Sequence, residues 1–161
     1  AKGITNAAVP MGATAVRGAI YDTVVNATER GIEFFHGYTY SGHPLAAAAG
    51  LATLALYESE GLLERAASLA ATWEAAVHSL RGAPHVIDVR NLGLVAGIEL
   101  ASRPGAVGTR AFDVFVNAFH EQDVLIRTTG DIIALSPPVI ISAAQVEELI
   151  GRVRRAIASV E

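Results

Sequence analysis

The sequence predicts an α/β chain built in two parts, residues 1–60 and residues 61–161. Three observations lead to this prediction. Two apolar helical patterns follow one another between residues 44 and 81, short runs rich in Val, Ile and Leu recur after residue 85, and an apolar stripe with helical spacing closes the chain. Because strands and helices alternate after residue 85, we expect the second part to form a compact α+β unit.

The first part is expected to be loop-rich before one long helix. Residues 1–16 are predicted to form a loop ending in a short buried strand from Ala13 to Val16, and residues 17–30 a short helix. An aromatic loop over 34–43 leads to Pro44, which suits the first position of a helix. That helix, over 44–59, carries alanine on every side, so we expect it to be buried between layers.

The second part is expected to begin with a helix over 62–81 that ends before Gly82 and Pro84. Strands are predicted over 86–90, 94–100, 124–127 and 132–135, with a turn at 128–131. A helix over 109–122 separates the two strand pairs, and its three phenylalanines are expected to face the core: Phe112, Phe115 and Phe119.

The last helix is predicted to start at Ser142, from a capping signal and the apolar stripe that follows it. Ser142 and Gln145 have the spacing of a capping box, in which each side chain bonds the other residue's backbone N–H. Glu148 and Arg152 lie one turn apart and are expected to pair. The apolar stripe of this helix consists of Val146, Leu149, Ile150, Val153, Ile157 and Val160.

Composition excludes several classes of function. The chain is 52% hydrophobic and only 17% charged, and its net charge is −4, which gives no basic surface for nucleic acid or an anionic membrane. No apolar run reaches the length of a transmembrane helix. Without cysteine, disulfides and thiolate metal sites are excluded, and the five histidines lack metal-ligand spacing. We therefore expect a cytoplasmic protein with no metal site.

Lys2 is the only lysine, against 11 arginines among the 12 Lys and Arg residues. Unlike a guanidinium, an amine can lose its proton and form a Schiff base with an aldehyde cofactor. A chance survivor in an arginine-biased proteome is the competing interpretation. Because the chain lacks an initiator Met and has excess apolar residues, we expect it to be the C-terminal part of a longer protein.

Three segments together resemble the C-terminal part of class III aminotransferases, which are pyridoxal-phosphate (PLP) enzymes of fold type I. They are AKGITNAAVPMGA, FFHGYTYSGHPLAAAAG and LIRTTGDIIALSPPVIIS, and RNLGLVAGIEL is similar to the first strand pair of the family's small domain. The second and third look closest to the β-alanine–pyruvate or ω-amino-acid–pyruvate group. The resemblance implies that residues 1–60 end the PLP-binding large domain and that residues 61–161 form the small domain.

The resemblance also implies roles for three residues. Lys2 matches the lysine that holds PLP as a Schiff base, Thr39 the threonine that binds the PLP phosphate of the neighbouring subunit, and Arg127 the arginine that grips the substrate carboxylate. From the residues alone, Thr39 is equally well a turn residue, and Arg127 is more easily explained by a surface ion pair. His36, Tyr38, Tyr40 and His43 are explained by a cofactor pocket or by core packing.

The function implied is transamination of an ω-amino acid or amine, with pyruvate as acceptor. The partners implied are a small amino donor, a keto acid, the upstream part of the same protein and a second subunit in a homodimer or larger assembly. Because the remaining PLP contacts in this family lie upstream of the lysine, we expect the 161 residues alone to be inactive. Diamine, 4-aminobutyrate and ornithine aminotransferases remain alternatives, as does a non-catalytic interaction module.

Overall fold

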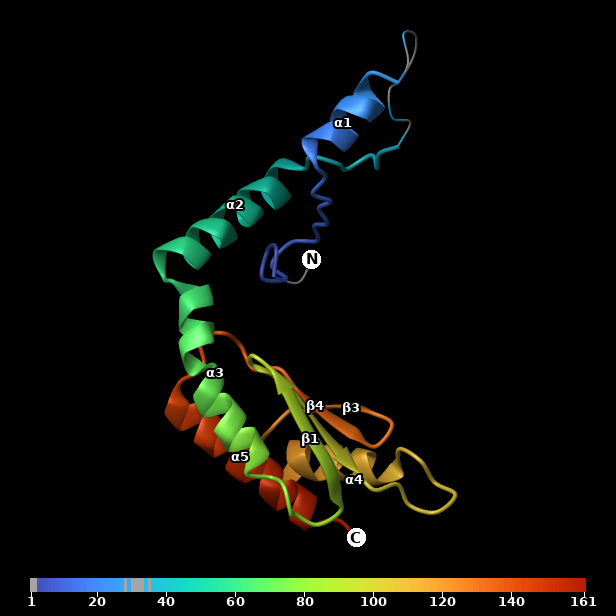
Figure 1. Cartoon of the computed structure of the whole chain (residues 1–161), viewed down its shortest axis with the longest axis vertical. Helices are drawn as coiled ribbons and strands as arrows, with labels where there is room; N and C mark the ends of the chain where they lie inside the picture. The colour runs from blue at the N-terminus through green and yellow to red at the C-terminus, as the bar shows by residue number, and fades with distance from the viewer. Residues whose placement is uncertain (1–2, 28, 30–33, 35) are drawn as a thin grey trace. The chain divides into compact units, whose positions relative to one another are not determined.

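The computed structural model describes residues 3–27, 29, 34 and 36–161. The chain divides into two compact units, Ala1–Glu60 and Gly61–Glu161 (Figure 1). The assignment of these units to a large and a small domain remains a prediction.

The first unit contains helices α1 (Gly18–Val25) and α2 (Pro44–Ser59). Pro44 stands at the start of α2, as the sequence predicts, and the His43 ring accepts a hydrogen bond from the Leu45 N–H at that end. The helix is not buried on every side within this unit, because only Ala46 and Gly50 are buried and its leucines are largely exposed.

Two expectations for the first unit are wrong. Residues 13–16 form no strand, and Val16 is 56% exposed rather than buried. A strand needs a neighbouring strand to take up its backbone hydrogen bonds, and none is present among the described residues of this unit. Helix α1 ends at Val25, where the Asn26 N–H bonds the Asp22 carbonyl, so it is shorter than the predicted span of 17–30.

The second unit is a four-stranded antiparallel sheet with helices packed on it (Figure 1). Its elements in chain order are α3 (Leu62–His78), β1 (Val86–Leu92), β2 (Val95–Leu100), α4 (Thr109–Glu121), β3 (Arg127–Thr129), β4 (Ile132–Leu135) and α5 (Ala143–Ala158). The strand order is β1-β2-β4-β3, so the short strand β3 lies at an edge of the sheet and, among the described residues, pairs with β4 alone.

One face of this sheet and its three helices form the core. Val89, Ile98 and Ile133 are paired across three strands and are almost completely buried. Trp73 of α3 and Val153 of α5 are fully buried in the same cluster. The strands therefore alternate between a buried face and an open face, as period-two patterning requires.

Of the three phenylalanines of α4, only Phe115 packs against the core. Phe112 is 57% exposed and Phe119 50%, whereas Ala111, Val114 and Ala118 are buried. Small side chains on the inner face allow a helix backbone to approach its neighbours closely. The expectation of a core position is therefore wrong for Phe112 and Phe119 and confirmed for Phe115.

Strand β3 also begins later than the sequence predicts. Asp123 has a positive φ of 52°, and the Val124 N–H bonds the Ala118 carbonyl, so these residues terminate α4. Thr128 and Thr129, predicted to lie in the turn, pair with Ile133 and Ile132. The turn is thus reduced to two residues, Gly130 and Asp131.

The predictions for the last helix are confirmed. Ser142 and Gln145 form the reciprocal capping box at the start of α5. The Glu148 carboxylate accepts hydrogen bonds from the Arg152 guanidinium, with a shortest distance of 2.7 Å. All six residues of the predicted stripe are buried or packed against the core.

Candidate functional site

The residues directly after Lys2 form a tight turn that is fastened to α2. The Tyr57 hydroxyl donates a hydrogen bond of 3.0 Å to the Gly3 carbonyl. Thr5 is buried, and its hydroxyl donates to the Val9 carbonyl at 2.6 Å. Lys2 itself lies outside the described residues, but the chain that follows it has a defined anchor.

A glycine of α2 lets this segment approach the helix. A Cβ placed on Gly50 would lie 3.2 Å from the Met11 sulfur, closer than side chains normally pack. The same Cβ would lie 3.9 Å from the Ile4 carbonyl. Gly50 is therefore the point at which the VPMGA segment and α2 come together.

Thr39 lies in a compact loop before α2. The Ser41 N–H bonds the Tyr38 carbonyl at 2.9 Å, and the Ser41 hydroxyl accepts from the Tyr38 N–H at 3.1 Å. Within the described part of the chain, neither the Thr39 amide nor its hydroxyl has a hydrogen-bond partner, and the residue is exposed. Both groups are therefore available to an anion.

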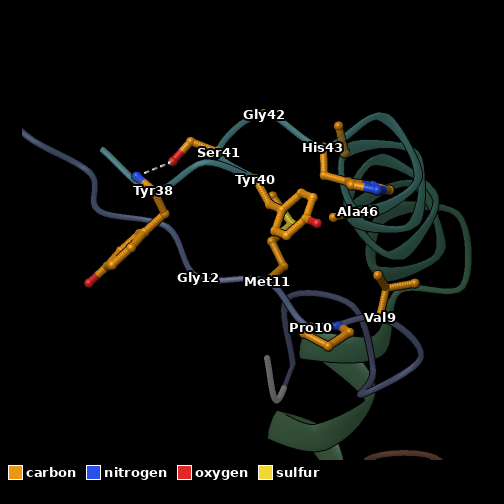
Figure 2. A pocket seen from close by; sticks show the side chains of 11 residues that line it. Val9, Pro10, Met11, Gly12, Tyr38, Tyr40, Ser41, Gly42, His43 and Ala46 are labelled. Carbon is orange, nitrogen blue, oxygen red and sulfur yellow. Dashed lines mark hydrogen bonds between the residues drawn. The ribbon is translucent and has the colours of Figure 1, made fainter. Parts of the chain in front are cut away.

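A hollow of about 470 Å³ separates this loop from the VPMGA segment (Figure 2). Three of the four aromatic residues considered for a pocket line it, namely Tyr38, Tyr40 and His43; His36 does not. Figure 2 shows Tyr40 and Met11 directed into the space between the two segments. Thr39 lies between two lining residues but does not line the hollow itself.

Arg127 belongs to the second unit, where it is the first residue of the edge strand β3. Its side chain is exposed, and among the described residues it has no ion pair or hydrogen bond. It lines a mainly apolar hollow of about 660 Å³ together with residues such as Phe115 and Leu135. The surface ion pair considered for Arg127 is thus absent from the described part of the chain.

Two further kinds of functional feature are absent from the described residues. These residues contain no group of three or more His, Asp or Glu side chains arranged to hold a metal ion. They also contain no helix long and apolar enough to cross a membrane.

Comparison with known proteins identifies the family of this chain. The family model for aminotransferase class-III matches residues 1–157. The chain belongs to the class III aminotransferase family. Members of this family are PLP-dependent enzymes, and the mixed helix and sheet structure of this chain corresponds to part of the transaminase fold.

Among class III aminotransferases, the chain is 56% identical over 161 residues to the omega-aminotransferase of Caulobacter vibrioides. It is 40% identical over 159 residues to the beta-alanine–pyruvate aminotransferase of Pseudomonas aeruginosa. These matches cover 100% and 98% of the chain but only 36% and 35% of the relatives. The chain therefore spans about a third of their length.

A solved transaminase from a study of ancestral reconstruction has a similar structure. The TM-score is 0.84 at 31% sequence identity, and the match covers 98% of this chain and 36% of that structure. The similarity thus extends over both units of this class III aminotransferase chain.

The donors in the first unit fit part of a PLP site. A hydroxyl and an amide on an exposed turn are the groups that bind phosphate oxygens, and Thr39 offers both. The sequence supplies the amine at Lys2, whose following residues are fixed by Tyr57 and Gly50. Sequence reasoning missed Gly50 and Tyr57, because contacts such as Tyr57–Gly3, which joins residues 54 positions apart, leave no local pattern.

Proposed function

We propose that the protein containing this chain catalyses PLP-dependent transamination of an ω-amino acid or amine, with pyruvate as the amino acceptor. The named activities of the relatives from Caulobacter and Pseudomonas support this substrate class. The observation that carries the proposal is Arg127, an exposed guanidinium without a partner in the described residues, on the wall of an apolar hollow. A free guanidinium there suits the carboxylate of an amino acid.

Lys2 is the proposed attachment point for PLP and the proposed general base. Bound PLP supplies the electron sink that makes the proton on the donor's amine-bearing carbon acidic. Lys2 Nζ then removes that proton, which requires the amine to be neutral. An apolar surrounding favours the neutral amine because burial disfavours the charged form.

Thr39 is proposed to bind the phosphate of PLP, and Arg127 the carboxylate of the substrate. The Thr39 hydroxyl and amide donate to the PLP phosphate, and Arg127 donates two parallel hydrogen bonds to a substrate carboxylate. Thr39 acts in the site of a second subunit, so the working form is at least a homodimer. We place this enzyme in the cytoplasm, without nucleic-acid or membrane partners.

The test uses the full-length protein with Lys2→Ala and Lys2→Arg. Borohydride reduction after incubation with PLP, followed by mass spectrometry, shows whether the cofactor is attached to Lys2. Turnover is followed as alanine formed from β-alanine and pyruvate. Lys2→Arg is the matched control, because it keeps the positive charge but not the titratable amine.

We expect the wild-type protein to give an adduct on Lys2 and both variants to lose the adduct and turnover. An adduct on another residue, or alanine formation by Lys2→Ala at the wild-type rate, contradicts the proposal. A panel of diamine, 4-aminobutyrate and ornithine donors, with 2-oxoglutarate beside pyruvate, separates the sister activities.

A further inference from the structure

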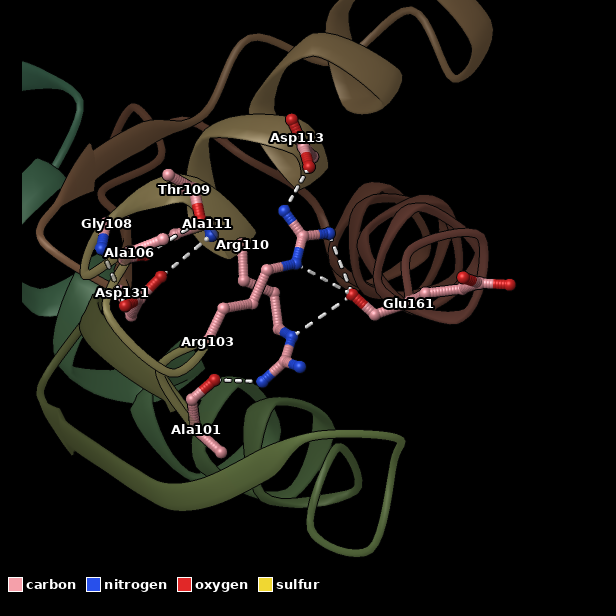
Figure 3. Close-up of polar contacts among 10 residues, drawn as sticks. All are labelled: Ala101, Arg103, Ala106, Gly108, Thr109, Arg110, Ala111, Asp113, Asp131 and Glu161. Carbon is pink, nitrogen blue, oxygen red and sulfur yellow. Dashed lines mark hydrogen bonds and ion pairs between the residues drawn. The ribbon is translucent and has the colours of Figure 1, made fainter.

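Asp131 stands at the tip of the β3–β4 hairpin and fixes that tip to the start of α4 (Figure 3). Only 6% of the residue is exposed. Its carboxylate accepts a hydrogen bond from the Gly108 N–H at 2.7 Å and another from the Ala111 N–H at 3.1 Å. Gly108 is the N-cap residue of α4 and Ala111 lies in its first turn, where backbone N–H groups lack partners within the helix. Asp131 therefore caps a helix that lies 20 residues earlier in the chain.

Two further contacts hold the same tip. The Leu100 N–H, at the end of β2, bonds the Asp131 carbonyl oxygen at 2.8 Å. Gly108 and Gly130 both have positive φ, and a Cβ on Gly108 would lie 3.6 Å from the Gly130 Cα. The hairpin tip thus lies with its backbone close against the start of α4.

The position of Arg127 depends on this tip. Strand β3 has only three residues and one neighbouring strand, so its own ladder provides few hydrogen bonds. On the other side of Arg127, the buried side chain of Ile126 holds the strand in the core. Arg127 therefore lies between two anchors, Ile126 before it and Asp131 after it.

The carboxylate of Asp131 does not compete with a substrate carboxylate for the Arg127 guanidinium. Burial raises the pKa of Asp131. Hydrogen bonds from the Gly108, Ala111 and Arg110 backbone and from the Ser102 hydroxyl lower the pKa by more than burial raises it, so the pKa lies below its ordinary value. The carboxylate is ionised at neutral pH and is compensated by the N-terminal end of α4. It has no ion pair with Arg127 in the described part of the structure.

We infer that Asp131 is a positioning residue for the substrate carboxylate site, acting through Arg127 by holding the β3–β4 hairpin against α4. The inference rests on the proposed role of Arg127 as the carboxylate ligand. Removing the cap loosens the edge strand and misplaces the guanidinium, while the chemistry at the amino group of the donor is left intact.

The experiment compares two donors in the full-length holoenzyme: β-alanine, which has a carboxylate, and 1-phenylethylamine, which has none. For Asp131→Ala we expect KM for β-alanine to rise on the order of tenfold, because small displacements of a positioning group are costly. We expect KM for the amine to stay within about twofold, with kcat retained for both donors. Asp131→Asn keeps one acceptor oxygen and should give a smaller change in the same direction, which covers the case that the alanine variant does not fold.

A double-mutant cycle with Arg127→Ala separates positioning from a general structural effect. In the Arg127→Ala background, Asp131→Ala should raise KM for β-alanine no further, because both act through one contact. Hydrogen exchange of residues 127–135, measured without donor, should be faster in both Asp131 variants. Asp113→Ala removes an exposed carboxylate from α4, the helix that Asp131 caps, and serves as the control. It should leave KM for β-alanine and KM for 1-phenylethylamine unchanged.

Three outcomes overturn the inference. Equal KM rises for the two donors indicate a structural role only, and an undiminished effect in the Arg127→Ala background indicates a route that bypasses Arg127. If Arg127→Ala itself leaves KM for β-alanine unchanged, the proposed carboxylate role fails first and the inference falls with it. The Arg127→Ala measurement therefore distinguishes the two failures.

Discussion

At the scale of single residues, charged side chains of the second unit differ in whether they have an ion-pair or hydrogen-bond partner. Arg90 and Arg103 are held by carboxylates, and Arg152 is held by Glu148. Asp131 is occupied by the backbone of α4. Arg127 is different, since its guanidinium is exposed and unpaired among the described residues. A cation in this state is suited to an anionic ligand that is not part of the chain.

For Arg127→Ala we expect KM for β-alanine to rise about 10- to 100-fold, since hydrogen bonds to charged groups contribute about 1.5–3 kcal/mol. Carboxylate-free amines should be spared. Steady-state kinetics with both donors measures the difference. Arg155→Ala removes an exposed arginine of α5 and is the control. Equal losses for both donors after Arg127→Ala would argue against a carboxylate ligand.

At the scale of elements, local signals and tertiary signals differ in how well they could be predicted. The capping box of α5 and the Glu148–Arg152 pair are local, because their partners lie three and four residues apart, and both were predictable. The buried face of α4 was not. Phenylalanine is more hydrophobic than alanine, yet the close approach of α4 to its neighbours selects Ala111 and Ala118 for the inside.

Ser142→Ala should lower the free energy of unfolding by about 1 kcal/mol, because the α5 N-terminus loses one side of its capping box. Denaturant unfolding of the full-length protein, monitored in the second unit, measures this change. Ser68→Ala within α3 is the matched control, since the Ser68 hydroxyl only bonds a carbonyl three residues earlier. A loss as large for Ser68→Ala as for Ser142→Ala would contradict the assignment to capping.

At the scale of the whole molecule, apolar burial is divided unequally between the two units. Every member of the hydrophobic core cluster lies in Gly61–Glu161. In the described part of Ala1–Glu60, the only buried hydrophobic residue is Ala46, while large side chains such as Leu51 and Tyr21 are exposed. The second unit therefore has the core that an independent fold requires, whereas the described residues of the first unit form no such core.

We expect residues 61–161, expressed alone, to fold and unfold cooperatively, and residues 1–60 alone to remain unfolded. Heat-induced loss of the near-ultraviolet circular dichroism of Trp73, which is fully buried in the core, monitors the first expectation. A two-dimensional NMR spectrum with narrow amide dispersion would confirm the second. A gradual, non-cooperative melt of 61–161 would show that its core depends on the rest of the protein.

The sequence by itself determined the order of helices and strands in the second unit, the capping box and stripe of α5, and the resemblance to the family, because these depend on local spacing and on motifs kept in order. It also singled out Lys2, Thr39 and Arg127 as a set. Only the tertiary structure decided which face of α4 is buried and that Gly50 admits Met11. It alone brought Asp131 to the start of α4. The physical reason is that these contacts join residues 20 to 40 positions apart, and their geometry depends on how closely backbones approach.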